Sequence, residues 1–151
     1  MHTGLVNHNL EITMAWQGEY TTTTNIAADK LFKAITDINS WPQWDHGLEH
    51  TQLAGPAVPG ASFTLKPRGG PLVKLTIDEC APWREVHTAH LFLGKMRSSH
   101  TYTQQGKTTQ IVFTIEVWGI LGLFWRTVLG KKLLAEAPAH TADFIAHVRT
   151  L

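Results

Sequence analysis

Residues 25–48 constrain the fold of this chain more than any other part of its sequence. A threonine-rich run, residues 16–26, precedes them and alternates with the period of two that is typical of a half-buried strand. In residues 28–38 apolar side chains recur at helical spacing, and the aromatic motif Trp41-Pro42-Gln43-Trp44 follows. Few small folds use this order of strand, short helix and aromatic turn. Together with the later segments, it predicts an α+β fold in which a curved antiparallel sheet holds one long helix.

The helix predicted over residues 28–38 has recognisable limits. We expect the side chain of Asn25 or Asp29 to accept a hydrogen bond from the first unpaired amides of this helix. Pro42 limits any continuation, so the Trp41–Trp44 motif is expected to form a turn or a second short helix. Its aromatic rings should lie over one end of the sheet.

The middle of the chain is divided into strand-length runs by glycine and proline turns. This spacing predicts an antiparallel meander, and with the first strand a sheet of six to seven strands. The expected strands cover residues 46–53, 61–66, 72–80, 85–93, 95–104 and 108–118. The last run alternates most cleanly, and we assign one set of its side chains to the concave face: Ile111, Phe113, Ile115 and Val117.

The end of the chain has the pattern of a long amphipathic helix over residues 123–151. Pro138 lacks an amide hydrogen, and its ring crowds the carbonyl group four residues earlier. We therefore expect a kink or break near residues 134–138, where the helix bends around the sheet.

Length and composition exclude several classes of protein. A chain of 151 residues fits one domain, expected over residues 16–151 after a flexible leader, residues 1–15, in which Met14 is an alternative start. The net charge of +1, without runs of like charge, argues against a nucleic-acid or anionic-membrane partner. The only cysteine, Cys80, has no partner for an internal disulfide, and no stretch predicts a membrane span or a secretion signal. We expect a soluble cytoplasmic protein; the oligomeric state is left open.

The order of these motifs resembles the helix-grip superfamily of START-like and birch-pollen-allergen-like proteins (SRPBCC). Within it, the chain is most similar to the bacterial polyketide cyclase/dehydrase and lipid-transport group. The resemblance covers roughly residues 16–151. It is carried by these features: Ile26-Ala27-Ala28, Leu31-Phe32, Thr36-Asp37, Trp41-Pro42-x-Trp44, Pro59-Gly60, Gly106-Lys107-Thr108 and the closing helix after Gly119. Where the usual helix entry is alanine-proline, this chain has Ala28-Asp29. The resemblance implies a cavity between sheet and helix, but members bind, convert or sense different ligands.

The expected ligand is a hydrophobic small molecule, lipid-like or polycyclic, held mainly by burial of apolar surface. No cofactor and no metal are expected. Twelve residues are the candidates for lining the cavity: Tyr20, Trp44, Phe63, Leu75, Ser98, His100, Tyr102, Phe113, Ile115, Trp125, Val128 and Leu129.

Two other functions stay open. In a cyclase or dehydratase, His100 and Tyr102, two residues apart on one face of a strand, would transfer protons at an enolisable carbonyl. In a regulatory or protein-interaction module, the cavity would be closed and an apolar patch would be exposed instead.

Histidine spacing does not predict a metal site. His46 and His50 are four residues apart, and His87 and His90 are three apart, which would converge only on a helix. Both pairs lie in predicted strands, so neither is expected to bind a metal together.

Overall fold

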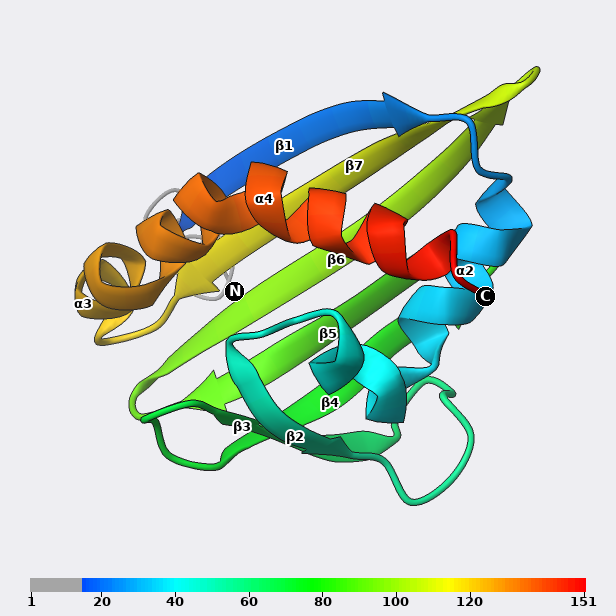
Figure 1. Cartoon of the computed structure of the whole chain (residues 1–151). Coiled ribbons are helices and arrows are strands. Elements are labelled where there is room, and N and C mark those ends of the chain that lie inside the picture. Colours follow the sequence, from blue (N-terminus) through cyan, green and yellow to red (C-terminus); the bar gives the residue numbers. More distant parts are fainter. Residues whose placement is uncertain (1–14) are drawn as a thin grey trace, which may run out of the picture.

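A single antiparallel sheet curves around a long C-terminal helix in the computed structural model, which describes residues 15–151 (Figure 1). The seven strands lie in the order β1-β7-β6-β5-β4-β3-β2. Their bounds are β1 Trp16–Thr24, β2 Leu48–Gln52, β3 Ser62–Pro67, β4 Val73–Ala81, β5 Arg84–Leu91, β6 Gly94–Gln105 and β7 Thr108–Trp118. The predicted fold class is confirmed. The predicted leader and the alternative start at Met14 lie outside the described residues, apart from Ala15.

The concave face of the sheet forms the core. On β7, Ile111, Ile115 and Val117 are 2%, 0% and 1% exposed, as their alternation predicted. Helix α4, Lys131–Val148, crosses this face and contributes Phe144 and Val148 to the same core (Figure 1). The concave assignment of this β7 set is therefore confirmed.

The first helical region has two parts. Helix α2, Ala28–Thr36, ends slightly earlier than predicted, and the 3-10 helix η1, Ile38–Gln43, contains the proline of the aromatic motif. Trp41 and Trp44 are 5% and 4% exposed, and the Trp41 indole N–H donates to the carbonyl oxygen of Ile35 at 2.9 Å. The motif is therefore a short helix with a buried tryptophan pair, as one of the two expectations had it.

The predicted cap of α2 is wrong. The N-cap residue is Ala27, and no side chain of Asn25 or Asp29 caps the helix. The backbone N–H of Ala28 instead donates to Oε1 of Gln104 on β6, at 2.9 Å. Asp29 accepts a hydrogen bond from the Trp83 indole. The sheet therefore supplies the acceptor that local sequence was expected to provide.

The closing helix is irregular at a place other than the one predicted. It begins as α3, Gly122–Trp125, continues as one π-helical stretch, η2 Arg126–Gly130, and becomes α4. Pro138 lies inside α4, which runs from Lys131 to Val148, so the break expected there is wrong, and the kink stays a prediction. Ala137 and Phe144 are buried on this part of the helix.

Gly130 packs tightly against the sheet. A Cβ on Gly130 would lie 2.9 Å from the Trp16 ring and 3.0 Å from Cγ2 of Val117. The π-helical stretch ends at this close contact. No helix within residues 15–151 is both long enough and apolar enough to cross a membrane.

Candidate functional site

Four side chains form a row across the concave face, which we call the central row. Tyr20 on β1 pairs with Phe113 on β7, Phe113 pairs with His100 on β6, and His100 pairs with Glu85 on β5. Paired residues on neighbouring strands direct their side chains to the same face of a sheet. The row therefore places a phenol, a phenyl ring, an imidazole and a carboxylate next to one another.

The central row is less covered than the residues beside it. Tyr20, Phe113 and His100 are partly exposed, whereas Ile111 and Ile115 on β7 are fully buried. All of these positions lie on the concave face, so the central row is a part of that face where side chains keep some exposure to solvent.

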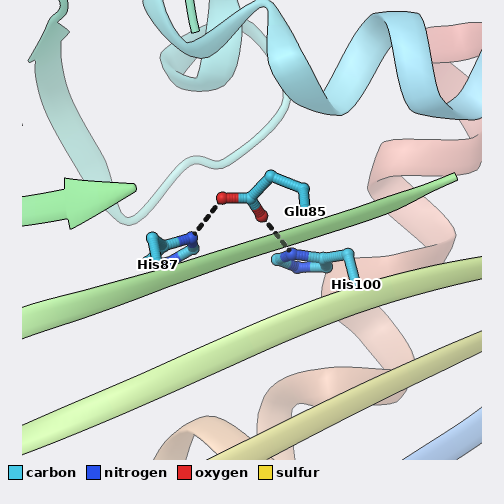
Figure 2. A group of neighbouring side chains, drawn as sticks. All are labelled: Glu85, His87 and His100. Carbon is cyan, nitrogen blue, oxygen red and sulfur yellow. Dashed lines mark hydrogen bonds and ion pairs between the residues drawn. The ribbon is translucent and has the colours of Figure 1, made fainter. Parts of the chain in front are cut away.

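A buried carboxylate joins two histidines at one end of the row (Figure 2). Oε1 of Glu85 lies 2.7 Å from Nδ1 of His87, and Oε2 lies 2.9 Å from Nδ1 of His100. An ionised carboxylate only accepts hydrogen bonds, so both Nδ1 atoms carry the hydrogen and donate it. In the neutral imidazole, Nε2 then holds the lone pair.

Charge in this cluster follows from burial and from these hydrogen bonds. Burial by itself raises the pKa of the fully enclosed Glu85 carboxyl, but the electrostatic attraction of His87 and the hydrogen bonds donated by His100 and His87 outweigh it and lower the pKa to about 2. Burial lowers the pKa of His100, and the hydrogen bond that His100 donates to Glu85 offsets this only in part. At neutral pH, Glu85 is therefore ionised and His100 is neutral.

Tyr102 adds a second polar group to this interior. It lies two residues after His100 on β6, on the same face, and it is 2% exposed. Its hydroxyl group has no hydrogen-bond partner among the described residues. Burial, helped by the charge of Glu85, raises the pKa of Tyr102 well above its usual value, so the phenol stays protonated and can donate.

Aromatic rings surround the two histidines. The His87 ring lies 5.4 Å from Trp41 and 5.7 Å from Phe63, and the His100 ring lies 5.3 Å from Phe113, measured between ring centroids. Apolar walls of this kind exclude water and strengthen the electrostatic interactions inside them. The site therefore combines few polar groups with a mainly apolar lining.

The structure brings most of the predicted lining residues to this interior. The strand register places eight of them on the concave face: Tyr20, Phe63, Leu75, Ser98, His100, Tyr102, Phe113 and Ile115. Trp44 packs against Phe144 of α4 at 4.9 Å, and Leu129 packs against the core.

The other two predicted residues lie elsewhere. Val128 is 50% exposed, and Trp125 donates to the carbonyl oxygen of Phe92 at one end of the sheet. Trp125 also packs against the edge of the core.

The prediction from the sequence did not include two residues of the cluster, Glu85 and His87. Their spacing of two on one strand was the available signal, since alternate strand residues share a face. His87 and His90 lie on opposite faces of the strand, as expected from their spacing. His87 is buried, and the exposed His90 forms a hydrogen bond with Thr76 at 2.8 Å.

The cluster also offers metal-ligand atoms. Glu85, His87 and His100 each present one such atom, and these atoms lie within 4.8 Å of one another. A metal ion bound there would have to replace the two hydrogen bonds to Glu85, because the atoms that could bind the metal already form those hydrogen bonds. The expectation of no metal site stays a prediction.

A hollow of about 310 Å³ opens to solvent beside the end of α4. None of the residues that line it belongs to a strand. The lining consists of Gln43, Trp44, His46, Asp143, Ala146, His147 and Thr150. Of the twelve predicted lining residues, Trp44 alone borders this hollow, so it does not correspond to the predicted cavity between sheet and helix.

Comparison with known proteins places the chain in a family. Residues 15–142 match the family described as polyketide cyclase/dehydrase and lipid transport. A comparison with curated protein sequences finds no match.

Solved structures show the same fold at low sequence identity. Ara h 8.0201 is similar with a TM-score of 0.74 and 14% identity, over 91% of this chain and 99% of that one. Norcoclaurine synthase from Thalictrum flavum, in complex with dopamine and hydroxybenzaldehyde, gives 0.70 and 15%, over 91% and 87%. The Zhui aromatase/cyclase from Streptomyces sp. R1128 gives 0.69 and 15%, over 89% and 94%.

The matched family covers most of the chain, and the structure has the helix-grip architecture that these proteins share. The protein is therefore a member of the polyketide cyclase/dehydrase and lipid transport family.

Proposed function

We propose that this protein binds a small molecule with an apolar body and one oxygen-bearing polar end, on the concave face between the sheet and α4. The unpaired hydroxyl of Tyr102 is the observation that carries this proposal. A buried polar group without a partner costs about 1–3 kcal/mol, and a ligand oxygen that accepts its hydrogen bond offsets that cost. The family description, which includes lipid transport, supports the apolar part.

The neighbouring groups indicate which polar end fits. Neutral His100, with Nδ1 bonded to Glu85, offers the lone pair of Nε2 to a ligand hydroxyl, while Tyr102 donates to a ligand oxygen. A phenolic or enolic hydroxyl satisfies both groups at once. The partly exposed rings of Tyr20 and Phe113 supply a flat apolar surface for the ligand body.

A substitution at Tyr102 tests the proposal because its two effects have opposite signs. Tyr102→Phe removes the unpaired hydroxyl, so the ligand-free protein is expected to be more stable by about 1 kcal/mol in urea denaturation. The same change is expected to weaken binding of 2-naphthol, followed by fluorescence titration, about tenfold. Binding of 2-methoxynaphthalene, which lacks the hydroxyl donor, should already be weaker to the unchanged protein.

Thr103→Val is the matched control, because Thr103 lies on the same strand with an exposed side chain. It should leave naphthol binding unchanged. Equal naphthol affinity of the Tyr102→Phe variant and the unchanged protein contradicts the proposal. So does the absence of both naphthol binding and a co-purifying molecule in native mass spectrometry of protein from its own host.

A second function, acid–base catalysis of the cyclase or dehydratase type, is favoured by one observation. Glu85 fixes His100 with Nδ1–H bonded, which leaves Nε2 to take a proton from a carbon next to a carbonyl group. Glu85 would stabilise the imidazolium that forms, and the protonated Tyr102 would donate to the developing enolate oxygen.

Proton exchange separates the two functions. A catalyst should exchange the α-protons of bound 2-tetralone for deuterium in heavy water, as followed by NMR, and His100→Leu should abolish that exchange. A binding protein should hold 2-tetralone without accelerating the exchange.

A further inference from the structure

Large apolar side chains gather at one end of the sheet, on two loops and on the helical turns α3 and η2 that follow the second loop. One loop joins β5 to β6, and the other leads from β7 into α3, which lies at the same end in Figure 1. Six side chains there are strongly exposed, and we call them the apolar tip: Phe92 73%, Leu93 48%, Ile120 85%, Leu123 64%, Phe124 51% and Val128 50%.

The two loops are fixed to one another. The backbone N–H of Leu121 donates to the carbonyl oxygen of Leu93 at 2.8 Å, and the Trp125 indole donates to that of Phe92 at 2.7 Å. Gly119 has a φ of +110°, and a Cβ there would lie 2.8 Å from the Cα of Gly94. Hydrogen bonds and close backbone packing therefore hold the two loops of the apolar tip in place.

Exposure of this extent indicates a partner. Scattered apolar side chains are normal on a protein surface, but six strongly exposed ones on two segments that hydrogen-bond to each other indicate an interaction site or a membrane contact. Burying one such side chain fully contributes roughly 1.5–3 kcal/mol. The tip can therefore supply substantial binding energy.

Positive charge borders the apolar tip. Residues 91–100 and 117–135 include Lys95, Arg126 and the neighbouring pair Lys131 and Lys132, and the nearest acidic residues in sequence, Glu116 and Glu136, lie directly outside the second range. Arg97, also in this region, is already paired with Asp78 at 3.5 Å. The small net charge of the chain thus conceals a local excess of positive charge at this end.

We propose that the apolar tip docks onto the surface of an anionic lipid bilayer. The apolar side chains would enter the boundary between headgroups and acyl chains, and the surrounding basic side chains would contact lipid phosphates. Apolar side chains bordered by more basic than acidic side chains suit this partner. Association of two tips in a symmetric dimer would bring the same positive charges together, so the charge pattern disfavours a second copy. This inference is independent of the proposed function.

Vesicle flotation tests the proposal. The full chain is expected to float with vesicles of phosphatidylcholine containing phosphatidylglycerol, more weakly at high salt, and much less with phosphatidylcholine alone. The double variant Phe92→Ser/Ile120→Ser should lose binding about tenfold or more. Lys131→Glu/Lys132→Glu should lose both binding and most of its salt dependence.

The control is Val58→Ser, which removes an apolar side chain that is 46% exposed and lies on the loop between β2 and β3. It should bind vesicles like the unchanged protein. Thermal unfolding of each variant establishes that it is folded, and quenching of tryptophan emission by brominated lipid gives a second readout, since Trp125 lies beside the tip.

Three outcomes would overturn the proposal. The first is equal flotation of the unchanged protein and the Phe92→Ser/Ile120→Ser variant. The second is binding to neutral vesicles as strong as to anionic ones. The third is a dimer in analytical ultracentrifugation that this variant dissociates, because the tip would then join two copies of the chain.

Discussion

Glu85 determines the chemistry of the interior at the scale of single residues. It has no exposed surface, and its two oxygen atoms each accept from a different histidine. A buried charge is stable only when it is paired and hydrogen-bonded, so the carboxylate and the two imidazoles act as one unit. That unit fixes Nδ1 as the nitrogen of His100 that carries the hydrogen in the partly exposed central row, while burial keeps the ring neutral.

Substitutions at Glu85 should therefore separate charge from hydrogen bonding. Glu85→Leu leaves both Nδ1–H groups without an acceptor and is expected to lower the free energy of unfolding by about 3–5 kcal/mol. Glu85→Gln should cost less, about 1–2 kcal/mol, because the amide can accept from one ring and donate to the other after a change of tautomer.

Urea denaturation measures both variants, with Glu136→Gln on the exposed side of α4 as the control. Equal losses for the leucine and glutamine variants would show that the cluster does not depend on hydrogen bonding.

At the scale of elements, helix α2 depends on a strand for its first hydrogen bond. Ala27 has the backbone angles of an N-cap, φ −62° and ψ 144°, but no side-chain oxygen, and Gln104 supplies the acceptor from β6. Gln104 also donates to the carbonyl oxygens of Gly106 and Thr108. One side chain thus joins the start of the helix to the turn between β6 and β7.

A serine at the N-cap would accept from the N–H of Asp29 or Lys30, whereas Gln104 accepts from that of Ala28. Ala27→Ser should therefore stabilise the protein by about 0.5–1 kcal/mol, and Gln104→Ala should destabilise it by about 1 kcal/mol or more, since several hydrogen bonds are lost. Because the two changes act on different amides, their effects on the free energy of unfolding should add in the double variant within about 0.5 kcal/mol, as measured by urea denaturation. A clearly larger gain from Ala27→Ser in the Gln104→Ala background would show that serine replaces the distant acceptor.

At the scale of the whole molecule, the two ends of the sheet carry different structural features. The apolar tip lies at the end formed by the β5–β6 turn and α3, whereas the Ala28–Gln104 contact lies at the end of the β6–β7 turn. The polar cluster and the central row lie on the concave face between them. Binding of a ligand and contact with a membrane would thus use different parts of one rigid sheet.

Global stability should depend on pH through the buried cluster. The pKa of Glu85 falls from 4.5 to about 2 on folding, so the unfolded chain takes up the proton more readily. The resulting stabilisation, about 3 kcal/mol, is full above about pH 4.5 and is lost as the pH falls towards 2. The lowered pKa of His100 acts in the same direction below its usual value of 6.5.

Urea denaturation at a series of pH values measures this dependence, and Glu85→Gln should flatten the acid part of the curve. The control Glu136→Gln should leave it unchanged. A Glu85→Gln curve parallel to that of the unchanged protein between pH 2 and 4.5 would contradict the assignment of the pKa to Glu85.

The sequence by itself determined the elements and the faces of the strands. Apolar and polar side chains alternate along residues 108–118, and this local pattern was sufficient because a strand can bury only one face. The same parity placed His100 and Tyr102 together on the concave side. The early helix, the aromatic turn and the closing helix were also predictable, since each has a period or a turn signal of its own.

Only the tertiary structure decided how distant segments meet. Glu85 and His100 lie on different strands and become partners through the β5–β6 register, and Gln104 reaches a helix 76 residues earlier. The apolar tip likewise joins loops around residues 92 and 120. Pro138 stays within a continuous helix because buried neighbours hold it there. These contacts depend on packing and pairing between segments far apart in the chain, which local periodicity does not encode.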